Sequence, residues 1–312
     1  MTTVLWLAVL VACVVGASLA SRRAVQSAIA VTERLGVSPA VVGVTVLAIG
    51  TDMPEIANSL VASATDHGDI NVGDSMGSVV TQVTLVLGLL CLLSNRIESG
   101  HSLTLPVGLA TVLASAVVWL LVGDGQLSHA DGAVLVSLWA VGTILLGRRE
   151  LQGHAPPSRS MNRRLVLDVG ATIAFLGLVG AFAYGVVESF LSLAATFGIP
   201  EFVGSFVALS IGTSLPELIV DWTAIRRGAS SMAIGDVFGS SFVDATLSIG
   251  IGPMVFAAAV SGEVVIGVVA AGVGVLLATV LVARARRFDR WLGISLLAVY
   301  AGVQLTTSVI AA

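Results

Sequence analysis

Apolar runs of membrane-spanning length recur along the chain, separated by short polar segments. A helix needs about 20 apolar residues to cross the hydrocarbon core of a bilayer. The pattern predicts ten transmembrane helices, over residues 4–20, 38–64, 71–94, 103–122, 131–147, 165–187, 200–225, 231–259, 263–283 and 290–310. The first run could also be a secretory signal, because Ala17–Ala20 offers small residues for cleavage. A helix is favoured, since no basic residue precedes this run and it is long for a signal.

The composition excludes a soluble globular domain and indicates an all-α polytopic membrane protein. Of the 312 residues, 56% are hydrophobic and 11% are charged, and the mean hydropathy is +1.01. No nucleophile–base pair or catalytic metal cluster is evident, so neither an enzyme nor a cofactor is expected. We expect the bilayer and transported cations as partners, no nucleic acid, and a chain that functions as a monomer.

The basic residues predict the orientation of the chain in a cell membrane. There is no Lys, and every Arg follows an odd-numbered predicted helix: Arg22, Arg23, Arg34, Arg96, Arg148, Arg149, Arg159, Arg163, Arg164, Arg226, Arg227, Arg284, Arg286, Arg287 and Arg290. The even-numbered loops carry acids instead: Asp66, Asp69, Asp124, Asp131, Glu201 and Glu263. Because basic loops stay on the cytoplasmic side, both termini are expected outside.

Two short motifs occur twice, and one constant offset along the chain relates both pairs of copies. The first is Gly-Thr-Asp-Met-Pro-Glu at 50–55 and Gly-Thr-Ser-Leu-Pro-Glu at 212–217. The second is Gly-Asp-Ser-Met-Gly-Ser at 73–78 and Gly-Asp-Val-Phe-Gly-Ser at 235–240. Acids, glycines and a proline are costly inside apolar helices. Keeping them twice in register indicates a transporter built from two repeats around an ion site.

We call the distance along the chain from one copy to the other, for example from residue 50 to residue 212, the repeat offset. It spans five predicted helices, an odd number. The second copy therefore enters the membrane from the opposite side, as in an inverted-topology repeat with its site near the midplane. We expect a first five-helix repeat over 1–147, a cytoplasmic linker over 148–164 and a second five-helix repeat over 165–312. The linker contains glycine and prolines and is too short to fold as a domain.

Pro54 and Pro216 each predict a break in a helix next to a carboxylate. Proline lacks a backbone donor and crowds the carbonyl four residues earlier. A helix interrupted in this way can turn carbonyl oxygens toward a cation. Glu55 and Glu217 follow directly, and hard cations such as Ca²⁺ take six to eight oxygen ligands of this mixed kind.

The third and eighth predicted helices carry further polar groups. Their glycines are expected weak points, at Gly73, Gly77, Gly235 and Gly239. Ser78 and Gln82 are four residues apart, as are Ser240 and Asp244, so each pair presents oxygens on one helix face.

Acidic residues inside these helices have no basic residue to balance them. They are Asp52, Glu55, Asp74, Glu217, Asp236 and Asp244, while no Lys, Arg or His lies in the interior of an apolar run. Buried charges are normally paired, protonated or bound to an ion. The compensating charge must therefore be mobile, as a metal ion, protons, or both in alternation.

These motifs resemble the two alpha-repeats of the calcium/cation antiporter superfamily, which includes the sodium/calcium exchangers. The family pattern is Gly-Thr-Ser-x-Pro-Glu, followed by Gly-Asn-x-x-Gly-Ser-Asn-x-x-Asn or Asp. Residues 212–217 match the first part fully, and 235–244 match most of the second. Two linked motifs, duplicated in register, are far more specific than one short match.

The resemblance implies that Glu55 and Glu217 are the central ligands of a divalent cation, together with the backbone carbonyls of Thr51 and Thr213. It implies that Ser78, Gln82, Ser240 and Asp244 complete flanking sites for sodium or protons. The candidate ligands are Thr51, Asp52, Glu55, Ser78, Gln82, Thr213, Ser214, Glu217, Ser240 and Asp244, followed by Asp74 and Asp236.

Some positions depart from the family pattern and bear on ion selectivity and coupling. Aspartate stands at Asp52 where Ser is usual, and at Asp74 and Asp236 where Asn is usual; Gln82 replaces Asn, and Val79 and Ser241 replace another Asn. Asp52 is either a ligand or a protonated neighbour of a charged carboxylate. Asp74 and Asp236 either cap a following half-helix or contact the ion.

Asp221 lies one turn beyond Glu217, towards Arg226 and Arg227. We expect it to be solvated or paired with one of these arginines. It is therefore not among the candidate ligands.

The resulting hypothesis is a secondary active antiporter that exports Ca²⁺ in exchange for Na⁺ by alternating access. Helices 1 and 6 are candidates to slide across a core of helices 2, 3, 7 and 8. The alternative is a Ca²⁺/H⁺ antiporter, which the extra carboxylates favour because closely spaced acids exchange protons. A cation channel is a third hypothesis, although channels usually build their acidic rings from several subunits.

Overall fold

Nearly every residue that the computed structural model describes is helical. The described residues are 3–35, 38–94, 97, 101–151, 163–194, 201–285 and 287–310. Among them, seven helices are long and apolar enough to cross a membrane, or eight if the bent pair Pro39–Thr51 and Met53–Ala64 forms one span. The count of ten spans and the orientation stay predictions. Arg96, Arg159, Arg286 and residues 152–162 of the predicted linker lie outside the described residues.

The helices follow one another in this order: α1 Thr3–Leu35, α2 Pro39–Val42, α3 Ala48–Thr51, α4 Met53–Ala64, α5 Gly68–Val80, α6 Leu87–Leu93, α7 His101–Leu121, α8 His129–Leu151, α9 Arg163–Ala194, α10 Glu201–Val203, α11 Ser210–Thr213, α12 Leu215–Arg226, α13 Ser230–Val243, α14 Ile249–Val255, α15 Gly262–Arg284 and α16 Arg290–Ile310. Wider π-helical turns occupy Gly43–Leu47, Thr81–Val86, Gly204–Leu209 and Asp244–Ser248. A 3₁₀ turn spans Val122–Asp124, and β1 (Gln126–Leu127) pairs antiparallel with β2 (Ala258–Ala259).

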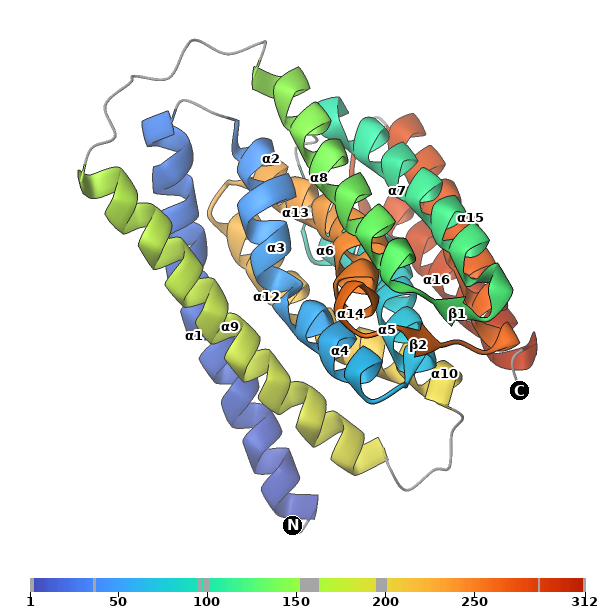
Figure 1. The fold of residues 1–312 in the computed structure, drawn as a ribbon. Helices are drawn as coiled ribbons and strands as arrows, with labels where there is room; N and C mark the ends of the chain where they lie inside the picture. The colour runs from blue at the N-terminus through green and yellow to red at the C-terminus, as the bar shows by residue number, and fades with distance from the viewer. Residues whose placement is uncertain are drawn as a thin grey trace.

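Helices α5 and α13 form the centre of the molecule, surrounded by the other helices (Figure 1). In the most apolar stretches of Gly68–Leu93 and Ser230–Val255, 78% and 89% of the residues are buried, against 17% in α8. Their apolar side chains belong to one continuous core with those of α7, α15 and α16. The central position explains why these two helices can hold polar groups away from lipid.

The glycines of α5 and α13 are points of close packing rather than breaks. Both helices continue through them, and the helical form changes only at the later π-helical turns. A Cβ at Gly77 would collide with the Phe206 carbonyl, and one at Gly239 would collide with the backbone of Val44. The prediction of weak points was therefore wrong, because the missing side chains let neighbouring backbones approach.

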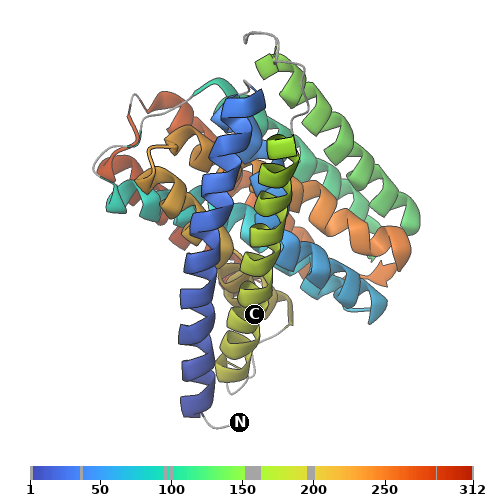
Figure 2. The same cartoon turned by 90° about the vertical axis from the view of Figure 1, so that its left-hand side faces the viewer.

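Helices α1 and α9 lie side by side along their length at the edge of the core (Figures 1 and 2). Both are longer than predicted, so Arg22, Arg23 and Arg34 belong to α1 instead of following it. No glycine or proline interrupts residues 17–35, so the helix has no reason to end at the membrane boundary. Arg34 forms an ion pair with Asp168 of α9.

The predicted helix over 231–259 ends at Val255. The chain then becomes extended, and Ala258 and Ala259 pair with Leu127 and Gln126. The last residues of this apolar run were therefore assigned wrongly, because pairing with a distant loop is not visible in local hydrophobicity.

Contacts between the two halves come in matching pairs. Adding the repeat offset to the partner in the first half and subtracting it from the partner in the second half gives another observed contact. The pair Gln126–Ala259 maps onto Phe288–Ile97, which also forms a bridge. The same offset relates the bounds of α4 to those of α12, α3 to α11, and α6 to α14. The two motif-bearing halves thus repeat both their local structure and their mutual contacts.

Candidate cation site

Both proline-containing motifs break their helices one residue before the new helix begins. Asp52 has φ −79° and ψ 8° between α3 and α4, and Ser214 has φ −81° and ψ 5° between α11 and α12. Pro54 and Pro216 lie in the first turn of the following helix, where a missing N–H costs little. The first break bends the chain by 44°. The predicted interruption of these helices is confirmed.

Three buried carboxylates converge beside the first break. Asp52, Glu55 and Asp244 each offer one oxygen, and the three oxygens lie within 4.8 Å of one another. Asp52 stands at the break, Glu55 in the first turn of α4, and Asp244 at the start of a π-helical turn after α13. All three side chains are fully buried. We call Asp52, Glu55 and Asp244 the carboxylate triad.

Glu217 lies next to the triad but is not part of it. Its side chain is fully buried beside Asp52 and Thr51. Neither of its carboxylate oxygens accepts a hydrogen bond from the part of the chain that the structure describes. Ser214, at the second break, likewise has a buried hydroxyl without a partner there. These oxygens remain available to a cation.

The hydroxyl groups of the motifs form two reciprocal hydrogen bonds across the halves. Thr51 Oγ1 lies 3.2 Å from Ser240 Oγ, and Ser78 Oγ lies 3.1 Å from Thr213 Oγ1. Shifting both members of one pair by the repeat offset gives the other pair. Ser78 also donates to Glu55 Oε1, at 3.4 Å. The candidate hydroxyls are therefore linked across the halves, and Ser78 also contacts a carboxylate of the triad; their role as ion ligands stays a prediction.

Gln82 connects two members of the triad. Its amide nitrogen donates to Asp244 Oδ2 at 2.9 Å and lies 3.5 Å from Asp52 Oδ1. Its amide oxygen accepts a hydrogen bond from Ser241 Oγ at 3.0 Å. Gln82 and Asp244 occupy equivalent positions in the two repeats, so a neutral donor in one half faces a carboxylate in the other.

Asp74 and Asp236 do not cap half-helices. Both lie in the interior of uninterrupted helices, α5 and α13, so the capping alternative is wrong. Asp74 accepts hydrogen bonds from Asn58 Nδ2 at 2.7 Å and from Thr213 Oγ1 at 3.0 Å. Asp236 receives none from the described residues.

Asp221 is the main site residue whose environment differs from the prediction. It is fully buried rather than solvated, and it is not paired with an arginine among the described residues. Its carboxyl group lies beside that of Asp236, on the neighbouring helix α13. The available signal was its spacing of one helical turn from Glu217, which places both on one face of α12. Asn58 was missed too, although it lies three residues after Glu55.

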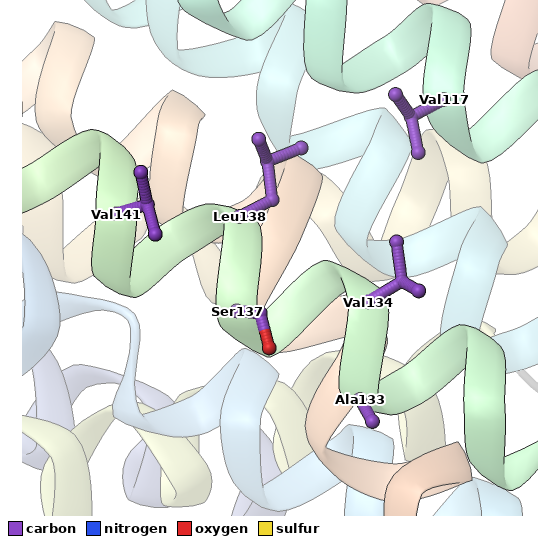
Figure 3. A pocket seen from close by; sticks show the side chains of 6 residues that line it. All are labelled: Val117, Ala133, Val134, Ser137, Leu138 and Val141. Atoms are coloured by element: carbon purple, nitrogen blue, oxygen red, sulfur yellow. The ribbon is translucent and has the colours of Figure 1, made fainter.

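The buried acids have no basic partner in the part of the chain described here. Seven acids are fully buried: Asp52, Glu55, Asp74, Glu217, Asp221, Asp236 and Asp244. The ion pair between Arg34 and Asp168 lies away from these acids. A groove between α7 and α8, lined by Val117, Val134, Leu138 and their neighbours, contains no acid (Figure 3). The polar centre is therefore the candidate site for cations.

A carboxylate-rich centre inside a bundle of membrane-length helices is typical of membrane ion transporters. The chain belongs to the sodium/calcium exchanger family, since the family model described as "Sodium/calcium exchanger protein" matches residues 5–147 and 167–309. It is thus a multi-pass membrane cation antiporter. The two matched ranges are again related by the repeat offset.

Individual relatives cover most of the chain. Inner membrane protein YrbG of Escherichia coli is 32% identical over 240 residues, 73% of each chain. Putative antiporter CaxA of Alkalimonas amylolytica is 27% identical and covers 90% of this chain and 92% of its own. A solved structure of the sodium-calcium exchanger NCX_Mj, soaked with Na⁺ and Sr²⁺, has a TM-score of 0.79 at 26% identity, covering 96% of this chain and 97% of that one.

Proposed function

We propose that this protein exports Ca²⁺ in exchange for Na⁺ by alternating access. The observation that carries the proposal is the carboxylate triad, three acidic oxygens within 4.8 Å without a fixed cation among the described residues. Oxygen ligands at such spacing suit a hard divalent cation, and the net negative charge needs a mobile partner. A relative from Methanosarcina acetivorans, 25% identical, is called sodium/calcium exchanger MaX1.

In this proposal the triad and Glu217 hold Ca²⁺, and the backbone carbonyls of Thr51 and Thr213 contribute further oxygens. Na⁺ ions use the neutral oxygens around them, from Ser78, Gln82, Ser214 and Ser240, together with Asp244. The two kinds of cation share carboxylates, so they compete for the same negative charge. Such competition is the physical basis of exchange.

We further propose ten transmembrane helices in two inverted repeats, 1–147 and 165–312, joined by a cytoplasmic linker at 148–164, with both termini outside the cell membrane. The reciprocal contacts support this arrangement, because exchanging the halves returns the same set of contacts, as a two-fold rotation does. With five spans in each half, such an axis lies in the membrane plane.

Helices α1 and α9 are the proposed moving part. They pack along each other, and Leu176 of α9 lies against Gly50 next to the first break. A shift of this pair across the core would change which side of the site is covered. The monomer contains all of the proposed parts, so we expect it to be the functional unit.

A Ca²⁺/H⁺ antiporter is the second candidate, and Asp52 is the observation that favours it. This residue adds a third carboxylate to the triad, where the family pattern has a neutral Ser. Closely spaced carboxylates bind protons in a coupled way when a metal ion leaves.

Uptake of ⁴⁵Ca²⁺ into proteoliposomes under imposed Na⁺ or H⁺ gradients tests both candidates. Uptake driven by an outward Na⁺ gradient is expected. Uptake driven only by a proton gradient would replace sodium by protons in the proposal. Accumulation that follows the Ca²⁺ gradient alone, with neither coupling ion, would indicate a channel and contradict both.

A further inference from the structure

The two halves of the protein surround equivalent aspartates differently. In the first half, the Asp74 carboxylate accepts hydrogen bonds from Asn58 and Thr213. In the second half, neither oxygen of the equivalent Asp236 accepts a hydrogen bond from the described residues, although the side chain is fully buried. One aspartate is therefore satisfied by the protein and the other is not.

The missing donors follow from the sequence of the second half. Val220 stands at the position of Asn58 and cannot donate. Thr51 bonds to Ser240 and to backbone carbonyls of its own helix, as its equivalent Thr213 does to Ser78 and its own helix. Unlike Thr213, however, Thr51 makes no bond to the aspartate of the other half. Asp236 thus has no neutral donor to replace the water that it loses on burial.

A second carboxylate takes the place of those donors. Asp221 stands where the first half has Ser59, whose hydroxyl accepts a hydrogen bond from the Gly252 N–H at 3.1 Å. Helices α12 and α13 pack against each other and bring the Asp221 and Asp236 carboxyl groups side by side, and none of their four buried oxygens accepts a hydrogen bond from another described residue. Two buried carboxylates in contact repel each other unless one of them is protonated or a metal cation lies between them.

We propose that Asp221 and Asp236 form a second site for a divalent cation such as Ca²⁺, present only in the second half. One divalent ion balances both carboxylates, and their four oxygens leave room for water within the six to eight ligands of Ca²⁺. The triad shares neither residue. Asp221 lies one turn of α12 from Glu217 and about another turn from Arg226, at the helix end. The second site lies along α12 between the α12–α13 turn and the central site, where it would be an intermediate binding site on the path of the ion. This role rests on the proposed function.

Equilibrium binding of ⁴⁵Ca²⁺ to purified protein in lipid nanodiscs counts bound ions without any gradient. The double variant Val220→Asn/Asp221→Ser recreates the first half's residues around Asp236, and it should bind one Ca²⁺ fewer per chain than the wild type. Asp236→Asn, a second and isosteric variant, should lose the same ion. Glu263→Gln removes an exposed acid and should leave the count unchanged. Gel filtration and the retained Ca²⁺ at the triad show that each variant is folded.

An unchanged count in both site variants would overturn the proposal. So would a wild type that binds one Ca²⁺ per chain, since the two carboxyls would then share a proton instead of a metal ion. These results leave coupled uptake in proteoliposomes intact. A wild type that binds two ions but exchanges none would contradict the proposed function and not the second site.

Discussion

Replacing Glu55 by Gln removes one charge from the carboxylate triad while keeping the shape of the side chain. Because the three oxygens lie within 4.8 Å of one another, an ion centred among them is at most about 2.8 Å from each. This upper limit is close to the 2.3–2.6 Å of Ca²⁺–oxygen contacts, so all three oxygens can contact one ion with little movement of the side chains. Glu55 can therefore contact the ion directly.

The magnitude follows from that separation. With an effective dielectric constant of about 20, a divalent ion about 2.8 Å from a carboxylate gains roughly 12 kcal/mol. The ion gives up bound water to obtain this energy, and removing one partner of a buried charge pair costs about 2–5 kcal/mol net. Taking about 3 kcal/mol, we expect the Kd for Ca²⁺ to rise roughly 150-fold.

Equilibrium ⁴⁵Ca²⁺ binding in nanodiscs measures this Kd, and proteoliposome uptake should fall below detection in the same variant. Glu263→Gln is the matched control, because it removes an equal charge from an exposed position. A Glu55→Gln protein that is folded and binds Ca²⁺ within threefold of the wild type would refute the assignment of the triad. An equal loss in the control would show that net charge, not ligation, controls binding.

Three further changes test other parts of the structure. Asp52→Ser restores the family residue and is expected to reduce any H⁺-driven Ca²⁺ uptake at least tenfold; proton coupling that persists in flux assays would exclude Asp52 as its source. Gly77→Ala should lower the free energy of unfolding by about 1–3 kcal/mol, because the added Cβ is overpacked against the Phe206 carbonyl. Gly170→Ala is the control: its added Cβ has nothing within 4 Å, so the free energy of unfolding should stay unchanged or rise by up to about 1 kcal/mol. Thermal unfolding that does not distinguish the two variants contradicts the packing argument. Cysteines introduced at Arg34 and Asp168 on a cysteine-free background should cross-link α1 to α9 without stopping exchange, and loss of transport on cross-linking would mean that the two helices do not move together.

Several properties of the protein could be predicted from its sequence alone. Apolar runs of membrane-spanning length identify a helical membrane protein, since in lipid each segment must satisfy its backbone hydrogen bonds internally, as a helix does. The proline motifs predicted both helix breaks, because the loss of a backbone donor acts locally. The duplicated motifs identified the family and supplied all three members of the triad as candidates. These are properties of short segments and of their spacing.

The tertiary structure decided which of these groups meet. Helical spacing places Glu217 and Asp221 on one face of α12, but it does not say which helix covers that face. The structure shows Asp236 there, so Asp221 is buried against another carboxylate instead of being solvated. In the same way, Gly77 permits close packing because Phe206 lies opposite it. Such pairings depend on how separate helices pack against one another, and a local sequence pattern does not show which distant helix covers a given face.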